Sequence, residues 1–156
     1  MKGVKKMDLQ MLIDEREITQ KLYRYVGLLD KREFELLGDI FAEDVVFDYA
    51  EGVDRKGIDA LKAILVTFIG GCGPTQHIAG CPIVEVNGDT ATSSVKVQAR
   101  HEGKGEKSGL NYDAHGNYHD KWIRTIDGWK VVRRDVEATV QFGDPTVLGQ
   151  APVISK

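Results

Sequence analysis

Leu-Tyr-Arg-Tyr-Val-Gly-Leu-Leu-Asp, residues 22 to 30, ends the first long amphipathic segment of the chain. Apolar residues in this segment recur with a period near 3.6 residues, which predicts a helix over residues 7–29. The stretch places Tyr25 and Asp30 at or beside the end of a largely apolar surface. Because a carboxylate on an apolar face is costly without a partner, we expect the rest of the chain to supply one.

Two further helices are predicted before the glycine-rich break at residues 70–74. The second carries Phe34, Leu37, Ile40 and Phe41 on one face, and the third runs from Ile58 to about Ile69. A short strand, Asp44–Tyr49, and a return strand, Val53–Lys56, are predicted between them.

From Thr75 onward the apolar period changes to two, which predicts strands. The expected strands are Thr75–Ala79, Pro82–Val86, Thr90–His101, Asn117–Thr125 and Trp129–Phe142. Asn87-Gly88 and Asp127-Gly128 are hairpin signals, and residues 102–111 are predicted to form a flexible loop. Helices followed by hairpins predict an α+β protein, with three N-terminal helices packed on one face of a strongly curved, mostly antiparallel sheet that can enclose a pocket.

Composition restricts the class of protein. A chain of 156 residues predicts one domain over 1–156, with a core at about 8–142 and a C-terminal tail at 143–156. The net charge of -3 argues against a nucleic-acid partner. Cys72 and Cys81 form neither a disulfide framework nor a zinc motif, and no nucleotide-binding loop occurs, so we expect no metal and no cofactor. No apolar run is long enough for a membrane span or a signal peptide, so a cytoplasmic protein is expected.

The alternation of the strands predicts which side chains face inward. In strand 129–142 the even positions are mostly apolar, which places Arg134 on the inward face between Val132 and Val136. A buried arginine needs an anionic partner or a polar cavity, so Arg134 is either half of an ion pair or part of a site. In strand 117–125 neither face is clearly apolar, and the pattern does not decide between them. Strand 90–101 is predicted to face inward with Ser93, Val95, Val97, Ala99 and His101.

His77 is the candidate general base. Histidine is the usual base near neutral pH, and a carboxylate bonded to one ring nitrogen fixes the tautomer and raises the basicity of the other nitrogen. Asp30 is the natural partner. The alternatives are a structural histidine, a solvent-exposed aspartate and a nucleophilic Cys81 on the same strand face. His101, His115 and His119 lie in or beside polar stretches and are predicted to be surface residues.

These landmarks resemble the SnoaL-like branch of the nuclear transport factor 2-like superfamily. They are Tyr25 with Asp30, Thr75-Gln76-His77, and Tyr118-x-Asp120-x-x-x-Arg124-x-x-Asp127-Gly128-Trp129. The resemblance covers residues 9–142. Within this branch the sequence resembles scytalone dehydratase, bile-acid 7α-dehydratase and hexachlorocyclohexane dehydrochlorinase. It implies a cone-shaped α+β barrel with an Asp–His pair at the mouth of its cavity. Asp30 and His77 fall at the pair's positions, Tyr25 matches a tyrosine that contacts the reacting group, and Arg134 matches an arginine of the pocket. The lysine of the dehydrochlorinase and the additional aspartate and arginine of the bile-acid enzyme have no match.

The residues and the resemblance together predict a cofactor-free acid–base lyase, first of all a dehydratase, for a small hydrophobic ring-containing substrate. His77 would remove a proton from carbon, and Asp30 would orient His77. Tyr25 would polarise a carbonyl or protonate a leaving group, and Arg134 would stabilise the negative charge that develops on the substrate. The predicted substrate contacts are Tyr118, Tyr49, Trp122 and Phe68. Alternatives are an isomerase of the ketosteroid isomerase type, a retro-aldol lyase and a non-catalytic ligand-binding or association module. A homo-oligomer, dimer or trimer, is expected.

Overall fold

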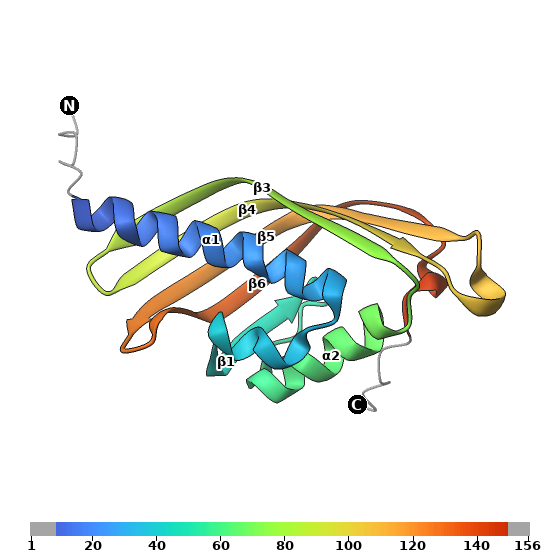
Figure 1. Cartoon of the computed structure of the whole chain (residues 1–156), viewed down its shortest axis with the longest axis horizontal. Helices are drawn as coiled ribbons and strands as arrows, with labels where there is room; N and C mark the ends of the chain where they lie inside the picture. Colours follow the sequence, from blue (N-terminus) through green and yellow to red (C-terminus); the bar gives the residue numbers. More distant parts are fainter. Residues whose placement is uncertain (1–8, 150–156) are drawn as a thin grey trace.

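The structure is a computed structural model that describes residues 9–149 (Figure 1). Its helices are α1 (Leu9–Lys31), η1 (Phe34–Asp39), α2 (Ile58–Gly70), η2 (Gly105–Lys107) and η3 (Pro145–Val147), where η denotes a 3-10 helix. Its strands are β1 (Phe41–Tyr49), β2 (Arg55–Lys56), β3 (Thr75–Asn87), β4 (Thr90–Glu102), β5 (Asn111–Thr125) and β6 (Gly128–Gly143). Within residues 9–149, no helix is long and apolar enough to cross a membrane.

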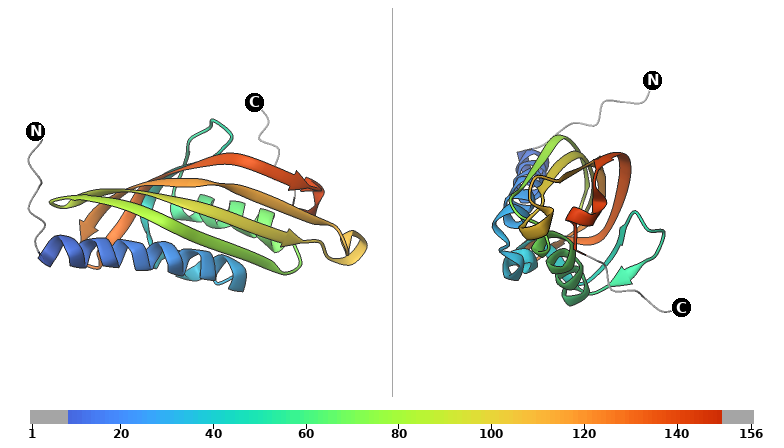
Figure 2. Two further views of the ribbon diagram at one scale, coloured as in Figure 1. Left: turned by 90° about the horizontal axis from the view of Figure 1, so that it is seen from above. Right: turned by 90° about the vertical axis from the view of Figure 1, so that its right-hand side faces the viewer.

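The six strands form one mixed sheet that is not closed, in the order β2-β1-β6-β5-β4-β3. The β1–β6 pair is parallel, and the other neighbouring strands are antiparallel. The sheet curls around the helices, which lie on its concave side (Figure 2). One hydrophobic core joins the helices to the sheet, with α1 contributing Leu22, α2 contributing Leu65, and the strands contributing Val95 and Trp122. The α+β fold class predicted from the order of elements is confirmed.

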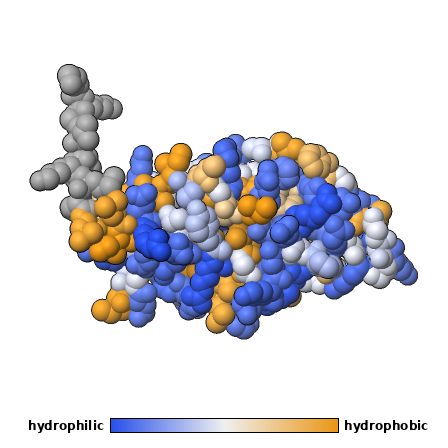
Figure 3. Space-filling model, turned by 45° about the horizontal axis from the view of Figure 1, so that its top comes forward, coloured by the Kyte–Doolittle hydropathy of each residue, from blue (hydrophilic) through white to orange (hydrophobic). Residues whose placement is uncertain are grey.

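The first turns of α1 extend beyond this core. Leu9, Leu12 and Ile13 are exposed there, and Figure 3 shows apolar side chains gathered at this end of the molecule. The fully buried apolar stripe of α1 begins at Ile18. The predicted start of this helix at residues 7 and 8 lies outside the described residues.

Several predicted boundaries are wrong because tertiary pairing overrides local pattern. Phe41, predicted in the second helix, starts β1, since the carbonyl of Ile40 accepts a hydrogen bond from the backbone of Val131. The two short strands predicted on either side of residue 81 join into β3 through an irregularity between Gly80 and Ile83. Strand β5 begins six residues before its predicted start at residue 117, because its first residues pair with β4.

The phase of β6 changes within the strand. Trp129 and Val131 are buried at its start, and Arg134 is buried further along, so the inward side passes from odd to even positions. The change occurs at Val132, an additional residue between the pairs Lys121↔Arg133 and Trp122↔Val131. Such a β-bulge turns the following side chains to the other face. The inward position predicted for Arg134 is therefore confirmed, whereas the inward position predicted for Val132 is wrong.

A buried carboxylate fastens α1 to the sheet. Asp14 is 2% exposed and accepts hydrogen bonds from Arg124 Nη1 and Nη2, at 2.8 and 2.7 Å, and from Trp129 Nε1 at 3.1 Å. The hydrogen bonds from Arg124, which outweigh the opposing effect of burial, lower the pKa of Asp14 from 3.8 to about 2. Because the pKa in the folded state lies below the unfolded value, this stabilisation is present above pH 3.8 and is lost as the pH falls towards 2.

Replacing Asp14 by asparagine is expected to lower the free energy of unfolding by about 2 kcal/mol at pH 7, the equivalent of this shift in pKa. The measurement is urea unfolding of both proteins at pH 7 and at pH 3, and the difference should shrink at the lower pH. Asp89→Asn is the matched control, because exposed Asp89 also bonds Arg124, at 2.9 Å, and should give almost no change. A difference between wild type and Asp14→Asn that stays constant with pH would contradict the expectation.

Candidate functional site

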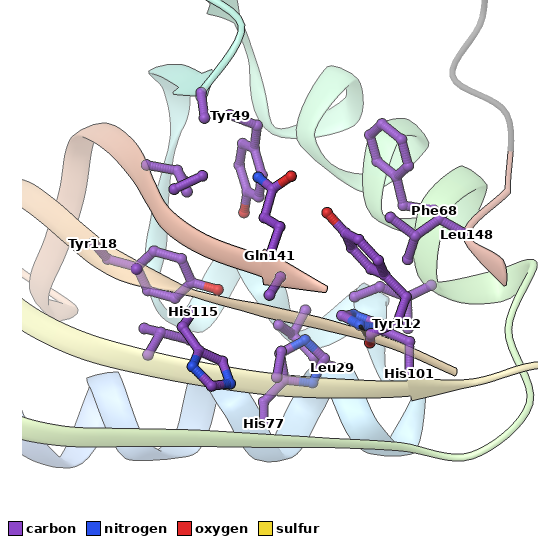
Figure 4. Close-up of a pocket in the computed structure, with 18 of the residues that line it drawn as sticks. Leu29, Tyr49, Phe68, His77, His101, Tyr112, His115, Tyr118, Gln141 and Leu148 are labelled. Carbon is purple, nitrogen blue, oxygen red and sulfur yellow. Dashed lines mark hydrogen bonds between the residues drawn. The ribbon is translucent and has the colours of Figure 1, made fainter. Parts of the chain in front are cut away.

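A cavity of about 210 Å³ lies between the helices and the concave face of the sheet (Figure 4). Its apolar wall includes Leu29, Leu65, Phe68, Ile69 and Leu148. Its polar side chains include His77, His101, His115, Tyr49, Tyr112, Tyr118 and Gln141. A concave, mostly apolar space with a few converging polar groups is typical of a small-molecule site.

Small side chains in the middle of the sheet create this space. His77, Ala99, Ala114 and Gln141 are successive partners across β3, β4, β5 and β6. The two alanines carry only methyl groups, so they leave the sheet uncovered between the polar side chains at either end of the row. A molecule seated over the alanines therefore meets His77 at one end and Gln141 at the other.

Asp30 and His77 meet where the end of α1 faces the start of β3. Asp30 Oδ1 is 2.7 Å from His77 Nδ1, and Asp30 Oδ2 accepts the backbone N–H of His77 at 2.9 Å. The hydroxyl of Thr75 donates to Asp30 Oδ1 at 2.9 Å, and Arg32 Nη1 donates to that hydroxyl at 2.7 Å. Since the carboxylate is held by both strand and helix, its position relative to the imidazole is defined by the fold.

The electrostatics define the tautomer of His77. Burial raises the pKa of Asp30, but the hydrogen bonds from His77 and Thr75 outweigh it, so the pKa is lowered below its ordinary 3.8. Asp30 is therefore ionised at neutral pH and only accepts hydrogen bonds. The Nδ1 of His77 must then be the donor, which leaves the lone pair of the neutral ring on Nε2. His77 lines the cavity, so this basic nitrogen is available to a ligand.

His101 is buried, as the inward face predicted for strand 90–101 requires, whereas the surface position predicted from the polar stretch around it is wrong. It is 6% exposed, its ring meets that of His77 edge-on with centroids 5.3 Å apart, and it lines the same cavity. Its Nδ1 donates to the backbone carbonyl of Tyr112 at 3.1 Å, and burial lowers its pKa below 6.5. His115 also lines the cavity and is only half-buried, whereas His119 is exposed as predicted.

Tyr25 does not line the cavity. It is fully buried, and its hydroxyl lies 2.6 Å from that of Tyr49, which does line the cavity. Helix α1 continues without a break through Gly27 to Lys31, so Tyr25 and Asp30 point to different sides of an intact helix. Any effect of Tyr25 on a ligand therefore passes through its neighbours that line the cavity, Tyr49 at its hydroxyl and Tyr118, whose ring centroid lies 5.8 Å from that of Tyr25.

Arg134 and Trp122 also lie away from the cavity lining. Arg134 is fully buried, and its Nε and Nη2 each donate to Asp120 at 2.7 Å. Its guanidinium carbon lies 4.3 Å from the ring centre of Tyr25 and 4.4 Å from that of Tyr118. Trp122 is 1% exposed and its indole N–H donates to Ser93 Oγ at 2.8 Å. The ion-pair alternative for Arg134 is the one that the structure forms, while predicted contacts Tyr49, Tyr118 and Phe68 do line the cavity.

Sequence reasoning missed Tyr112, Gln141 and Leu148 as lining residues. Tyr112 precedes the start predicted for β5, so the alternation of that strand predicts no face for it. Gln141 follows a second irregularity of β6, opposite His115 and Gly116, which again shifts the inward phase. Within residues 9–149, no group of three histidine, cysteine or acidic side chains is arranged to hold a metal ion.

The fold and this cavity define a class of protein. The SnoaL-like domain family matches residues 10–135, and the chain belongs to this family. The uncharacterized protein Rv2910c of Mycobacterium tuberculosis is 33% identical over 128 residues, which span 78% of this chain and 82% of that protein.

Solved structures share the same architecture. Kfla4162 from Kribbella flavida superposes with a TM-score of 0.80 at 23% identity, over 87% of this chain and 97% of that one. A candidate scytalone dehydratase from Novosphingobium aromaticivorans has a TM-score of 0.76 at 26% identity, over 93% and 96% of the two chains. Hexachlorocyclohexane dehydrochlorinase LinA-type3 from Novosphingobium barchaimii has a TM-score of 0.75 at 17% identity, over 94% and 100%. A nuclear transport factor 2-like superfamily protein from Salmonella enterica superposes with a TM-score of 0.74 at 18% identity, over 83% and 93% of the two chains, so the fold is the one seen in that superfamily.

Proposed function

We propose that the protein is a cofactor-free acid–base lyase, and first of all a dehydratase, that acts on a small, largely apolar ring compound. The observation that carries this proposal is the 2.7 Å contact between Asp30 Oδ1 and His77 Nδ1 at the wall of the cavity. An imidazole oriented in this way presents a basic nitrogen to a bound molecule, as general base catalysis requires. The structural similarity to proteins named as a candidate scytalone dehydratase and as dehydrochlorinases supports an elimination reaction.

In the proposed reaction, Nε2 of His77 removes a proton from a carbon atom beside an activating group. Asp30 stabilises the imidazolium that forms, because its carboxylate is ionised and bonded to Nδ1. The hydroxyl groups of Tyr49 and Tyr118, which also line the cavity, polarise a substrate carbonyl. The body of the ring packs on the apolar wall around Phe68. Arg134 contributes from beneath the cavity, through its contact with Tyr118.

The experiment is a screen of small hydroxylated cyclic ketones and phenols, with products followed by mass spectrometry for the wild type and His77→Ala side by side. We expect loss of water with the wild type and a rate at least about 10²-fold lower with the variant. A product of unchanged mass would indicate an isomerase, and cleavage into two fragments would indicate a retro-aldol lyase. Equal rates for the two proteins would exclude His77 as the base, and binding without conversion would favour a ligand-binding module.

A further inference from the structure

Two buried tyrosines present unpaired hydroxyl groups to the cavity. Tyr112 and Tyr118 are each 8% exposed and line the cavity, and Figure 4 shows their hydroxyl groups directed into it. Neither hydroxyl has a hydrogen-bond partner within residues 9–149, in contrast to Tyr49, which bonds Tyr25. Because a buried tyrosine hydroxyl normally has a partner, these two groups are free to bind a ligand.

The register of the sheet places Tyr112 near the proposed base. Tyr112 pairs with His101 on β4 and with Gly143 on β6. This row of paired residues lies two residues along the strands from the row that contains Ala99 and Ala114. Residues two apart on a strand point to the same face, so Tyr112 and Ala114 share the inward side. The ring of Tyr112 therefore lies beside the space over Ala99 and Ala114 on the β5 side, whereas His77 borders the same space from β3. One bound molecule can contact both side chains.

The ring of Tyr112 is held in place by its neighbours. On one side it lies against His101, with ring centroids 6.0 Å apart, and its backbone carbonyl accepts the Nδ1–H of that histidine. It also packs in a small buried cluster with Cys72 and with Val147 of η3, which is 1% exposed. The C-terminal segment thus fixes the ring, while the hydroxyl group stays directed at the cavity.

The protonation state of Tyr112 suits a donor. Burial raises its pKa above the ordinary 10.0, so the phenol is protonated at neutral pH. Hydroxide is a poor leaving group, and a positioned acid that supplies a proton to the departing oxygen accelerates such a step. The Asp30–His77 pair accounts for the base, but it provides no such acid.

We propose that Tyr112 is a further catalytic residue, the acid that protonates the departing hydroxyl oxygen; this rests on the proposed dehydratase function. His77 Nε2 takes the proton from carbon, and the C–H electron pair forms the new double bond. The C–O pair leaves with the oxygen, which takes the phenolic proton of Tyr112 and departs as water. The imidazolium of His77 then returns its proton to the phenolate through that water, so the protein is unchanged after each turnover.

The test compares two substrates that share one ring and differ only in the leaving group, hydroxyl or chloride. Tyr112→Phe is the informative variant, because it keeps the contacts of the ring with His101 and Val147. With the hydroxyl substrate, kcat should fall about 10²-fold. With the chloride substrate, which leaves as an anion without a proton, kcat should change less than about 3-fold.

Tyr118→Phe is the matched control, since Tyr118 is equally buried and equally unpaired. Its proposed role at the carbonyl serves both substrates, so both should slow by similar factors. Equal losses on the two substrates for Tyr112→Phe, or no loss on the hydroxyl substrate, would overturn the assignment of Tyr112 alone. A wild type that converts neither substrate would overturn the dehydratase function, and the assignment with it.

Discussion

Replacing Asp30 by asparagine is expected to lower kcat of the proposed elimination by about 10²- to 10⁴-fold, the range that a positioned general base contributes; a loss near the upper end is typical when the carboxylate that orients a catalytic histidine is neutralised. The physical reason is the tautomer of His77. The two oxygens of Asp30 accept the backbone N–H of His77, its Nδ1–H and the hydroxyl of Thr75. Asparagine has a single acceptor oxygen. If that oxygen keeps the backbone bond, the amide NH₂ faces Nδ1, the ring proton moves to Nε2, and the cavity loses its base.

The measurement is kcat of Asp30→Asn on the substrate that the screen identifies, with circular dichroism to show that the fold persists. Thr75→Val is the matched control, because it removes one hydrogen bond from Asp30 but keeps the carboxylate beside the imidazole. That control should lose less than about 10-fold. If Asp30→Asn retains a rate within a few-fold of the wild type, the carboxylate is not needed to orient His77 and the pair is structural.

The elements with a strong period were the ones that sequence reasoning located well. Helix α2 begins at Ile58 as predicted, and the inward face predicted for β4 is buried from Ser93 to His101. In both cases a single amphipathic period runs through the whole element. The bulge at Val132 is different, since it depends on the extra residue that β6 accommodates opposite β5. Local sequence carries no signal for that choice.

The candidate site divides in the same way. The partnership of Asp30 with His77 follows from chemistry, because an acid on an apolar helix face and a histidine on a nearby strand satisfy each other. The partner of Arg134 depends on cross-strand register, and the face of β5 that carries Asp120 was not decided by its pattern. Tyr112 was missed because polar residues around it resemble a loop, whereas the pairing of β5 with β4 extends the strand through them.

Breaking the buried ion pair is expected to have the largest effect on stability. Asp120 is 2% exposed and Arg134 is fully buried, and two parallel hydrogen bonds join them. Replacing Asp120 by leucine leaves the guanidinium without its counter-ion in the core, which should lower the free energy of unfolding by about 3–5 kcal/mol. Urea unfolding measures the change. Asp54→Ala is the matched control, because Asp54 pairs with the adjacent Arg133 at an exposed position and should give no measurable change.

Asp120→Leu combined with Arg134→Met separates the two roles considered for Arg134. Removing both charges leaves no unpaired ion, so the double variant should be more stable than Asp120→Leu by about 3 kcal/mol or more. A double variant no more stable than the single one would contradict the ion pair as the source of the loss.

The kcat of the stable double variant then tests whether Arg134 contributes to catalysis. Recovery of wild-type kcat would make Arg134 structural, a role consistent with its position behind Tyr118 and outside the cavity lining. A kcat still reduced by about 10-fold or more would mean that the buried charge polarises the Tyr118 hydroxyl during the reaction.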